Sequence, residues 1–504
     1  MSSLGTAVEM IRPTSWLGSI DLKDAFYSIP IREEDRKLLK FTWEGQLYQF
    51  TSLPNGLACA PYFFTKLLTP LFVEARLQGI QCFPYIDDIF VMGDTYQECL
   101  TSIAKLCEIL DSAGLVIHPE KSSLTPSQEL IFLGFHIDSV AMSITLTEAK
   151  VEKIESVIRE LLETRVITIR NCAQIIGLMI AYTPAVDYGL AHTKKIEKCR
   201  NRALVGSKGN FDATMILSER AKEDLEWWLR NAKHGVRLIR SDLPDVRLFT
   251  DASLQGWGAY AEGISIGGRW HEEEVEHINV MELEAIYLGL LSFCREGGKH
   301  IHVSTDNTTA MAYVRKMGGV RSASCNEVAA RIWEWAEVTK AWLTVSFLPG
   351  VLNVEADRAS RVFRDNIEWS LNPKAFARIC KFFGYPEIDL FASRKNAKCD
   401  IYVSLDLDPH SSYIDAFTLS WEGINAYAFP PFSLIGRVLK KAEEEKPDSL
   451  ILVAPDWPSA HWYPRLLEKA KKKIKFGKKR SNIMTNPDYT ERFPKGIGLI
   501  VLLL

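Results

Sequence analysis

The spacing of apolar and polar residues changes along the chain, and these changes predict its organisation. In residues 16–144, short apolar runs alternate with segments of helical periodicity, which is typical of an α/β unit. Residues 147–228 carry apolar side chains at spacings of three to four, which predicts an almost wholly helical segment. A loop at 240–245 leads into a second α/β unit that ends near Arg361, and a third α/β stretch follows from about Asn372.

Composition places this 504-residue chain among globular proteins of several domains, because 47% of its residues are hydrophobic and 24% are charged. The longest apolar stretch, GLIVLLL at the C-terminus, is too short to span a bilayer, and the N-terminus lacks the pattern of a secretory signal. We therefore expect an intracellular protein without a membrane partner. The ten cysteines include no C-x-x-C pair and are expected to be reduced thiols, rather than disulfides or zinc ligands.

Three aspartates mark the first α/β unit. The segment FPYIDDIFVM predicts a hairpin with Asp87 and Asp88 at its tip, a place where Asp also occurs for purely conformational reasons. A helix is predicted to follow, with a capping box from Thr95 to Glu98. Asp21 lies inside the β-prone run SIDLKDAFYSIPI between two apolar neighbours, where a carboxylate needs a partner or a bound cation.

Two Mg²⁺ ions held by such carboxylates are the usual apparatus of phosphoryl transfer. Five segments in order, DLKDAF, SLPNGLACAPYFF, YIDD, GLVIHPEKS and FLGFHID, resemble the palm of reverse transcriptases. The resemblance implies that Asp21 and Asp87 bind both metals and that Asp88 assists. Two Mg²⁺ per active site are expected, with Mn²⁺ as an alternative ion.

The same resemblance implies three nucleotide-binding residues. Phe26 would close on the sugar 2′ position and favour deoxynucleotides. Asn55 lies where relatives carry Gln or an aromatic residue, and Lys121 would neutralise the departing pyrophosphate, although a single loop lysine is usually solvated. In the family a fingers region precedes the first aspartate, whereas twenty residues precede Asp21 here, so we expect a truncated polymerase.

Four carboxylates recur in the second α/β unit, and each has a simple structural explanation. Asp251 ends a strand before a glycine-rich turn, and Asp306 ends the run HIHVSTD. Glu282 lies three residues after Asn279, so a capping box would account for it. Asp357 follows LPGVLNVEA and begins the run DRASR.

Together the segments TDAS, MELEAI, STDN and PGVLNVEADRASR resemble ribonuclease H over about 115 residues. The resemblance implies that Asp251, Glu282, Asp306 and Asp357 bind two metals, with which a water molecule cleaves the RNA strand of an RNA–DNA hybrid.

The C-terminal stretch resembles the extension of DIRS-type (tyrosine-recombinase) retrotransposons and, more distantly, adenine-N6 methyltransferases. In those enzymes an Asn or Asp precedes the pair of prolines and accepts hydrogen bonds from the target amine. Phe429 stands at this position, which predicts a non-catalytic tail. The basic run 469–480 predicts that the tail binds nucleic acid, with a solvated face or a flexible arm as the alternative. Trp457 and Trp462 are expected either to stack on bases or to pack in the core.

The fold class expected is therefore multidomain α/β and α+β, typical of a DIRS-type Pol fragment. The predicted domains are a palm at 1–145, a helical thumb and connection at 146–241, a ribonuclease H domain at 242–365 and a methyltransferase-like extension at 370–504. Expected partners are an RNA template, a DNA primer, an RNA–DNA hybrid and dNTPs, with a recombinase or integrase on a separate chain. The alternative is a catalytically silent nucleic-acid-binding remnant of a retroelement.

Overall fold

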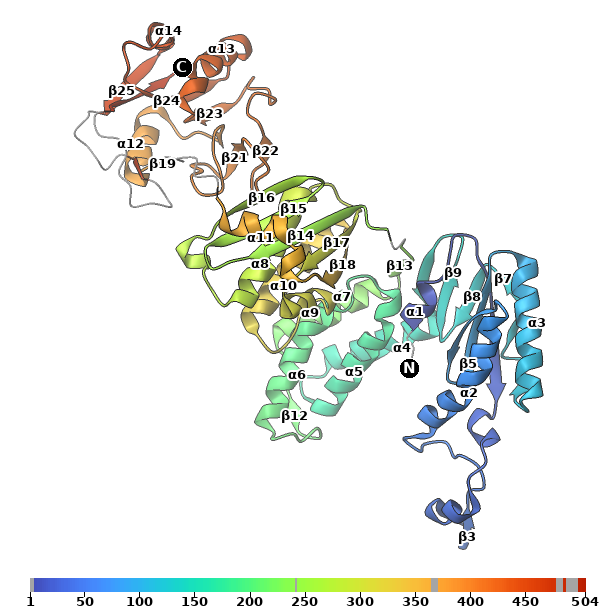
Figure 1. Cartoon of the computed structure of the whole chain (residues 1–504). Helices are drawn as coiled ribbons and strands as arrows, with labels where there is room; N and C mark the ends of the chain where they lie inside the picture. The colour runs from blue at the N-terminus through green and yellow to red at the C-terminus, as the bar shows by residue number, and fades with distance from the viewer. Residues whose placement is uncertain (1–3, 241–242, 364–369, 477–483, 486–496) are drawn as a thin grey trace. The chain divides into compact units, whose positions relative to one another are not determined.

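A computed structural model describes residues 4–240, 243–363, 370–476, 484–485 and 497–504. The chain forms two compact units, Met1–Leu243 and Pro244–Leu504, and each combines helices with β-sheets (Figure 1). This confirms the predicted mixed α/β class, while the domain boundaries at 145 and at 365–370 stay predictions. All ten cysteines are free. Within the described ranges, no helix has both the length and the apolar character needed to cross a membrane.

The first unit contains a five-stranded sheet with strand order β4-β5-β1-β6, in which β7 also pairs with β1. Its strands are β1 Trp16–Lys23, β4 Gln81–Tyr85, β5 Asp88–Gly93, β6 Val116–Ile117 and β7 Ser123–Ser127. Helices α2 (Ala60–Leu77) and α3 (Tyr96–Ser112) share a buried core with Ile20 and Ile89 of this sheet. Because side chains alternate along a strand, the neighbouring Asp21 and Asp88 lie on the face away from these helices.

Several local predictions for this unit are confirmed. The strands β4 and β5 form the expected hairpin, with Ile86 and Asp87 between them. Helix α3 begins with a capping box in which the Thr95 side chain accepts from the Glu98 backbone N–H and the Glu98 carboxylate accepts from the Thr95 N–H. A second, four-stranded sheet has strand order β13-β10-β9-β8. Its strands are β8 Glu129–Phe132, β9 Phe135–Asp138, β10 Ser143–Leu146 and β13 Val236–Leu238.

The segment predicted to be almost wholly helical contains four α-helices and one short two-stranded sheet. These elements are α4 Glu148–Glu163, β11 Ile167–Thr168, α5 Ile169–Tyr182, α6 Lys194–Gly206, β12 Thr214–Met215 and α7 Glu219–Asn231. The remaining elements of the first unit are α1 Leu4–Val8 and the exposed hairpin of β2 Lys40–Trp43 and β3 Gln46–Gln49.

The second unit begins with a mixed five-stranded sheet of order β16-β15-β14-β17-β18. Its strands are β14 Val246–Ala252, β15 Gly256–Ala261, β16 Ile264–Arg269, β17 His300–Thr305 and β18 Trp342–Phe347. The first three strands pair antiparallel, whereas β17 runs parallel to both β14 and β18. The helices of this segment are α8 Ile278–Phe293, α9 Thr308–Arg315, α10 Ala323–Thr339 and α11 Val354–Arg361.

The predicted start of helix α8 is wrong by two residues, and this changes the interpretation of Glu282. His277 is the N-cap, and its ring Nδ1 accepts a hydrogen bond from the Asn279 backbone N–H at 3.2 Å. The Asn279 side chain instead accepts from the Asn307 amide at 2.9 Å. Glu282 therefore lies beyond the first turn, and a capping box does not explain it.

The C-terminal part of the second unit is a seven-stranded sheet of order β22-β21-β20-β23-β24-β27-β25. Its strands are β20 Ile388–Asp389, β21 Ile401–Ser404, β22 Tyr413–Ile414, β23 Asn425–Ala428, β24 Ser449–Pro455, β25 Lys472–Phe476 and β27 Leu499–Leu503. Neighbours from β22 to β24 pair parallel, and β27 pairs antiparallel with both β24 and β25. The other elements are β19 Ser370–Leu371, α12 Pro373–Phe383, α13 Ile435–Glu445, α14 Tyr463–Lys469 and β26 Met484–Thr485.

Two predictions about the tail are settled in part. Residues 472–476 of the basic run form a β-strand and not a flexible arm, while Lys478, Lys479 and Arg480 lie outside the described residues. Trp462 is 6% exposed and packs in the core, whereas Trp457 is 38% exposed.

Candidate functional site

The first carboxylate site is built where β1 meets the tip of the β4–β5 hairpin. Asp21 and Asp88 are directly opposed in the antiparallel register of β1 and β5. Asp87 occupies the turn, and its carbonyl oxygen accepts from the Leu22 backbone N–H at 3.0 Å. The pairing of two strands thus brings the three predicted aspartates together, although Asp21 is more than sixty residues away in sequence.

Electrostatics at this first site indicate that it suits a cation. Burial, together with the neighbouring Asp87 and Asp21 carboxylates, raises the pKa of Asp88 to about 6. A hydrogen bond joins Asp88 to Asp21, and Lys121 is the cation that lowers the pKa of Asp88. Carboxylates this close repel one another when ionised, and a dication with oxygen ligands relieves that repulsion. Lys121 therefore lies near the aspartates, and its predicted role at the departing pyrophosphate stays a prediction.

Two residues that the sequence did not single out hold the backbone of Asp21. The Asp21 N–H donates to the Ser122 hydroxyl at 2.9 Å, and the Asp21 carbonyl accepts from the His118 N–H at 2.8 Å. The Ser122 hydroxyl in turn donates to the His118 carbonyl at 2.7 Å. Both residues lie in GLVIHPEKS, the segment from which the sequence indicated only Lys121. A small polar residue next to that lysine, Ser122, was the one signal that could have indicated a further contact.

The two remaining nucleotide-contact predictions, Phe26 and Asn55, stay predictions. Phe26 packs edge to face against Phe64 of α2, with ring centroids 5.4 Å apart. Asn55 is exposed, and its amide donates to the Tyr27 hydroxyl at 3.4 Å. The tyrosine is therefore an additional residue at this position that the sequence did not indicate.

The second carboxylate site gathers three of the four predicted acids. Asp251 comes from β14, Glu282 from α8, and Asp306 directly follows β17. One carboxylate oxygen of each lies within 4.8 Å of the others, and Asp251 and Glu282 are each only 3% exposed. Three buried or half-buried carboxylates at this spacing offer the hard oxygen ligands that Mg²⁺ and Mn²⁺ prefer.

Glu282 is the clearest sign that this second site is built for a cation. Burial, together with the charges of Asp251 and Asp306, raises the pKa of Glu282 to about 9. One oxygen of its carboxylate, Oε2, is buried and has no hydrogen-bond partner. An unpartnered buried acceptor beside two further carboxylates is costly without a positive charge. The donor set therefore fits a divalent cation.

Asp357, the fourth predicted acid, stands apart from this cluster. Its carboxylate accepts from the Arg361 guanidinium Nε at 2.8 Å, one helical turn further along α11. The charge of Asp357 still raises the pKa of Asp251, so the two groups are near one another. Its predicted role as a ligand stays a prediction.

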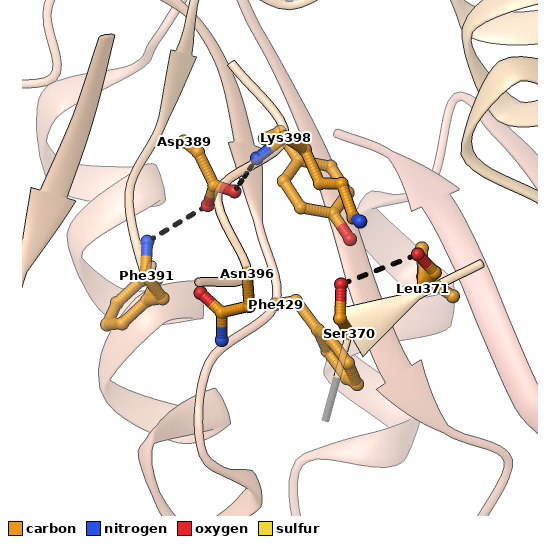
Figure 2. Close-up of a pocket in the computed structure, with 8 residues that line it drawn as sticks. Ser370, Leu371, Asp389, Phe391, Asn396, Lys398 and Phe429 are labelled. Carbon is orange, nitrogen blue, oxygen red and sulfur yellow. Dashed lines mark hydrogen bonds between the residues drawn. The ribbon is translucent and has the colours of Figure 1, made fainter. Parts of the chain in front are cut away.

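In the tail, a small cavity lies at the carboxyl ends of β20 and β23 (Figure 2). Asp389 is buried there, and its two oxygens accept from the backbone N–H groups of Phe391 and Lys398 at 3.2 and 3.0 Å. Burial raises the pKa of Asp389 to about 7. Phe429 lines the same cavity, whose volume of about 10 Å³ is far below that of typical ligand pockets.

Comparison with known proteins agrees with the first site. Residues 5–137 match the family model described as reverse transcriptase (RNA-dependent DNA polymerase). The Pro-Pol polyprotein of simian foamy virus type 1 is 36% identical over 129 residues, which cover 26% of this chain and 11% of that protein. The enzymatic polyprotein of cauliflower mosaic virus (strain D/H) is 25% identical over 261 residues, or 51% of this chain and 35% of that protein.

Among solved structures, the chain is similar to the foamy viral protease–reverse transcriptase in complex with an RNA/DNA hybrid. The match covers 74% of this chain and 49% of that chain, with 20% sequence identity and a TM-score of 0.42. The chain thus spans only a minor part of the viral polyproteins that it matches. Residues 5–137 form a reverse transcriptase domain of the kind found in retroviral and retroelement Pol polyproteins.

Proposed function

We propose that this chain copies RNA into DNA at Asp21, Asp87 and Asp88 and cleaves the RNA of the resulting hybrid at its second carboxylate site. The observation that carries the second activity is the cluster of Asp251, Glu282 and Asp306 within 4.8 Å, in a chain that also contains a reverse transcriptase domain. Copying and hybrid cleavage act on successive states of one nucleic acid, so their presence on one chain is chemically coherent.

At the second site, bound Mg²⁺ would supply positive charge for the scissile phosphate and the attacking water. The chain contributes the geometry. Asp251 and Glu282, both buried, and Asp306, half-buried, hold their oxygens close together, while the Asp357 carboxylate pairs with Arg361. Because water is the attacking group, this reaction requires no protein nucleophile.

At the first site, Asp21 and Asp87 would hold the metal ions and Asp88 would assist, while Lys121 neutralises the pyrophosphate. Phe26 would exclude a 2′-hydroxyl, and Asn55 with Tyr27 would contact the nucleotide. The proposed partners are an RNA template, a DNA primer and dNTPs. Burial raises the pKa of Asp88, and the positive charge of Lys121 opposes that rise. The ammonium therefore lies near the aspartates, which supports this arrangement.

Hybrid cleavage is tested with labelled RNA–DNA duplex and Mg²⁺. We expect the protein to release short RNA products and Asp306→Asn to abolish them, because the substitution removes a charged ligand. Asp245→Asn is the matched control, since Asp245 accepts from the His300 backbone at 2.7 Å and does not belong to the cluster. Cleavage that persists in Asp306→Asn contradicts the assignment, and a folded wild type without cleavage favours the silent remnant.

Separate metal sites are tested by the reciprocal substitution. Asp87→Asn should remove primer extension and leave hybrid cleavage intact, because Asp87 belongs to the first unit and the nuclease cluster to the second. Loss of both activities in a folded Asp87→Asn protein refutes two independent sites.

For the tail, we propose a non-catalytic extension of the DIRS type that is related to methyltransferases. Its mostly parallel sheet reverses strand order at β20, which is where doubly wound sheets bind ligands. Phe429 lines the cavity there. Its phenyl ring has no oxygen or nitrogen, so it cannot accept the hydrogen bonds that an Asn or Asp at this position accepts from the target amine. Binding of S-adenosylmethionine by the full chain, lost on substitution of Asp389, would overturn this proposal.

A further inference from the structure

Ser360 carries a contact that the proposed chemistry leaves unused. Its side chain is completely buried, and its hydroxyl lies 2.6 Å from Oδ2 of Asp251. The same hydroxyl lies 2.8 Å from the carbonyl oxygen of Asp357. One serine therefore contacts the carboxylate of one predicted metal ligand and the backbone of another. A hydroxyl that donates to a carboxylate makes a short, charge-assisted hydrogen bond that fixes which way the carboxylate points.

The position of Ser360 is itself tightly fixed. Helix α11 lies directly on strands β15 and β16, and a Cβ added at Gly258 would meet the Ala356 carbonyl oxygen at 2.1 Å and the Ser360 nitrogen at 2.5 Å. On the neighbouring strand, a Cβ at Gly267 would lie 2.4 Å from the Ala359 carbonyl oxygen. The absence of side chains at these glycines lets the helix backbone touch the sheet. The Ser253 hydroxyl also donates to the Ser360 carbonyl at 2.6 Å.

Other residues of the segment 349–361 support the same cluster. The Asn353 amide, which is buried, donates to the Thr250 carbonyl at 2.9 Å, one residue before Asp251. A Cβ at Gly350 would lie 2.7 Å from Oδ2 of Asp306, so only glycine leaves that carboxylate its place. The segment thus touches the surroundings of Asp251 and Asp306, as well as supplying Asp357.

We propose that Ser360 is a positioning residue for the nuclease metal centre, which orients the Asp251 carboxylate toward the ion through its hydroxyl. The inference rests on the proposed function of this site and adds a residue to it. Ser360 would touch neither substrate nor metal and would act only through Asp251. Its removal should weaken metal binding more than it slows the chemical step once metal is saturating.

Hybrid cleavage by the full chain, measured across a Mg²⁺ titration, tests this split. For Ser360→Ala we expect the half-saturating Mg²⁺ concentration to rise roughly 10-fold to 100-fold, the usual effect of losing an outer-shell partner of a metal ligand. The rate at saturating Mg²⁺ should change little. Ser360→Thr keeps the hydroxyl and should restore the Mg²⁺ requirement of the wild type. Ser292→Ala is the matched control, because Ser292 is equally buried but donates to the Leu288 carbonyl within α8.

A second measurement is independent of cleavage. Mn²⁺ binding to the full chain is measured by calorimetry, and the part lost in Asp306→Asn is assigned to the nuclease centre. Ser360→Ala should weaken this part by the same factor, even if no hybrid is cleaved and the proposed reaction fails. If Ser360→Ala does not fold, Ser360→Cys, which has the same shape and a weak donor, carries the test.

An unchanged Mg²⁺ requirement together with unchanged Mn²⁺ affinity overturns the inference, as does an equal shift in Ser292→Ala. A folded Ser360→Thr protein that behaves as Ser360→Ala also overturns it, because the hydroxyl would then be irrelevant. If the wild type has no Asp306-dependent Mn²⁺ binding, both the inference and the metal centre on which it rests are wrong.

Discussion

Two adjacent glycines of β16 provide a sharp test of how helix α11 is seated. Gly267→Ala places a methyl group 2.4 Å from the Ala359 carbonyl oxygen of the helix backbone and 2.5 Å from the Trp257 carbonyl oxygen of strand β15. Gly268→Ala meets only the Trp257 indole nitrogen, at 3.2 Å, and a side chain can yield by a few tenths of an ångström. We expect Gly267→Ala to displace α11 and to impair the nuclease, and Gly268→Ala to be nearly neutral.

The magnitude follows from the distances. Ordinary contact begins at 3.4 Å, so the helix must retreat by about 1 Å to accommodate the new methyl group. The Ser360 hydroxyl, now 2.6 Å from Asp251, would then approach the limit of a hydrogen bond. Overpacking costs about 1–3 kcal/mol, and loss of a hydrogen bond to a charged group about 1.5–3 kcal/mol, so local destabilisation of roughly 3–5 kcal/mol is expected.

Hydrogen exchange measured by mass spectrometry on peptides covering 354–361 reports the local stability of α11 without assuming that the two units unfold together. Gly267→Ala should accelerate exchange in these peptides by two orders of magnitude or more, since about 1.4 kcal/mol corresponds to a factor of ten. Hybrid cleavage should fall in parallel. Equal exchange in the two alanine variants would refute the argument that backbone contact at Gly267 seats the helix.

Two further predictions concern charge. Asp224 is fully buried, and burial raises its pKa to about 6, although its carboxylate accepts from the backbone N–H groups of Lys195 and Ile196. Because the folded-state pKa exceeds the ordinary 3.8, this group contributes stability that is fully present below pH about 4 and is lost as the pH rises through about 6. Relative to Asp224→Asn, the free energy of unfolding should fall by about 3 kcal/mol between pH 4 and 7, measured by urea unfolding with hydrogen exchange of α6 and α7 peptides as the readout. Parallel curves of stability against pH for the two proteins would contradict this prediction. In the tail, replacing Lys471, Lys472 and Lys473 by Gln should flatten the slope of log affinity against log salt for single-stranded nucleic acid by about two to three units if each contacts one phosphate. Lys475→Gln is the control, because its ammonium already pairs with Asp456 at 3.0 Å, and an unchanged slope in the triple variant would assign those lysines to solvent.

The sequence indicated Asp87, Asp251 and Asp306 because each lies where a β-prone run ends or turns. Asp21 instead lies inside strand β1, and Glu282 and Asp357 lie on helices α8 and α11. Alternation within β1 and β5 places Asp21 and Asp88 on one face once the two strands pair. What no local pattern could supply was the set of residues that hold these acids. Ser122 and Ser360 contact aspartates that are 101 and 109 residues away, and a serine in a loop or helix carries no signal for such a partner.

The start of helix α8 shows how a strong local pattern is outcompeted. Asn followed three residues later by Glu is a standard capping signature, and it predicted that Glu282 serves the helix end. A neighbouring amide, that of Asn307, bonds the Asn279 side chain instead, and the His277 ring takes over the capping role. The helix boundary is therefore set by the tertiary contact between Asn307 and Asn279, and Glu282 belongs to the carboxylate cluster instead of the helix cap.

The basic run of the tail illustrates the same limit for charge. Its density favoured nucleic-acid binding, with a solvated face or a flexible arm as the alternative, because lysines repel one another and gain little from a packed core. The apolar C-terminal strand β27 excludes the flexible arm for residues 472–476. Its residues are buried along nearly the whole strand, so it needs a hydrogen-bonded neighbour on both sides, and β24 supplies only one of them. Lys472–Phe476 supplies the other, and its exposed lysines lie on the last strand of the sheet, where charged side chains discourage pairing with another molecule. Charge in this strand is therefore already explained by protection of the sheet edge, and nucleic-acid binding must be demonstrated by the salt dependence of the exposed lysines.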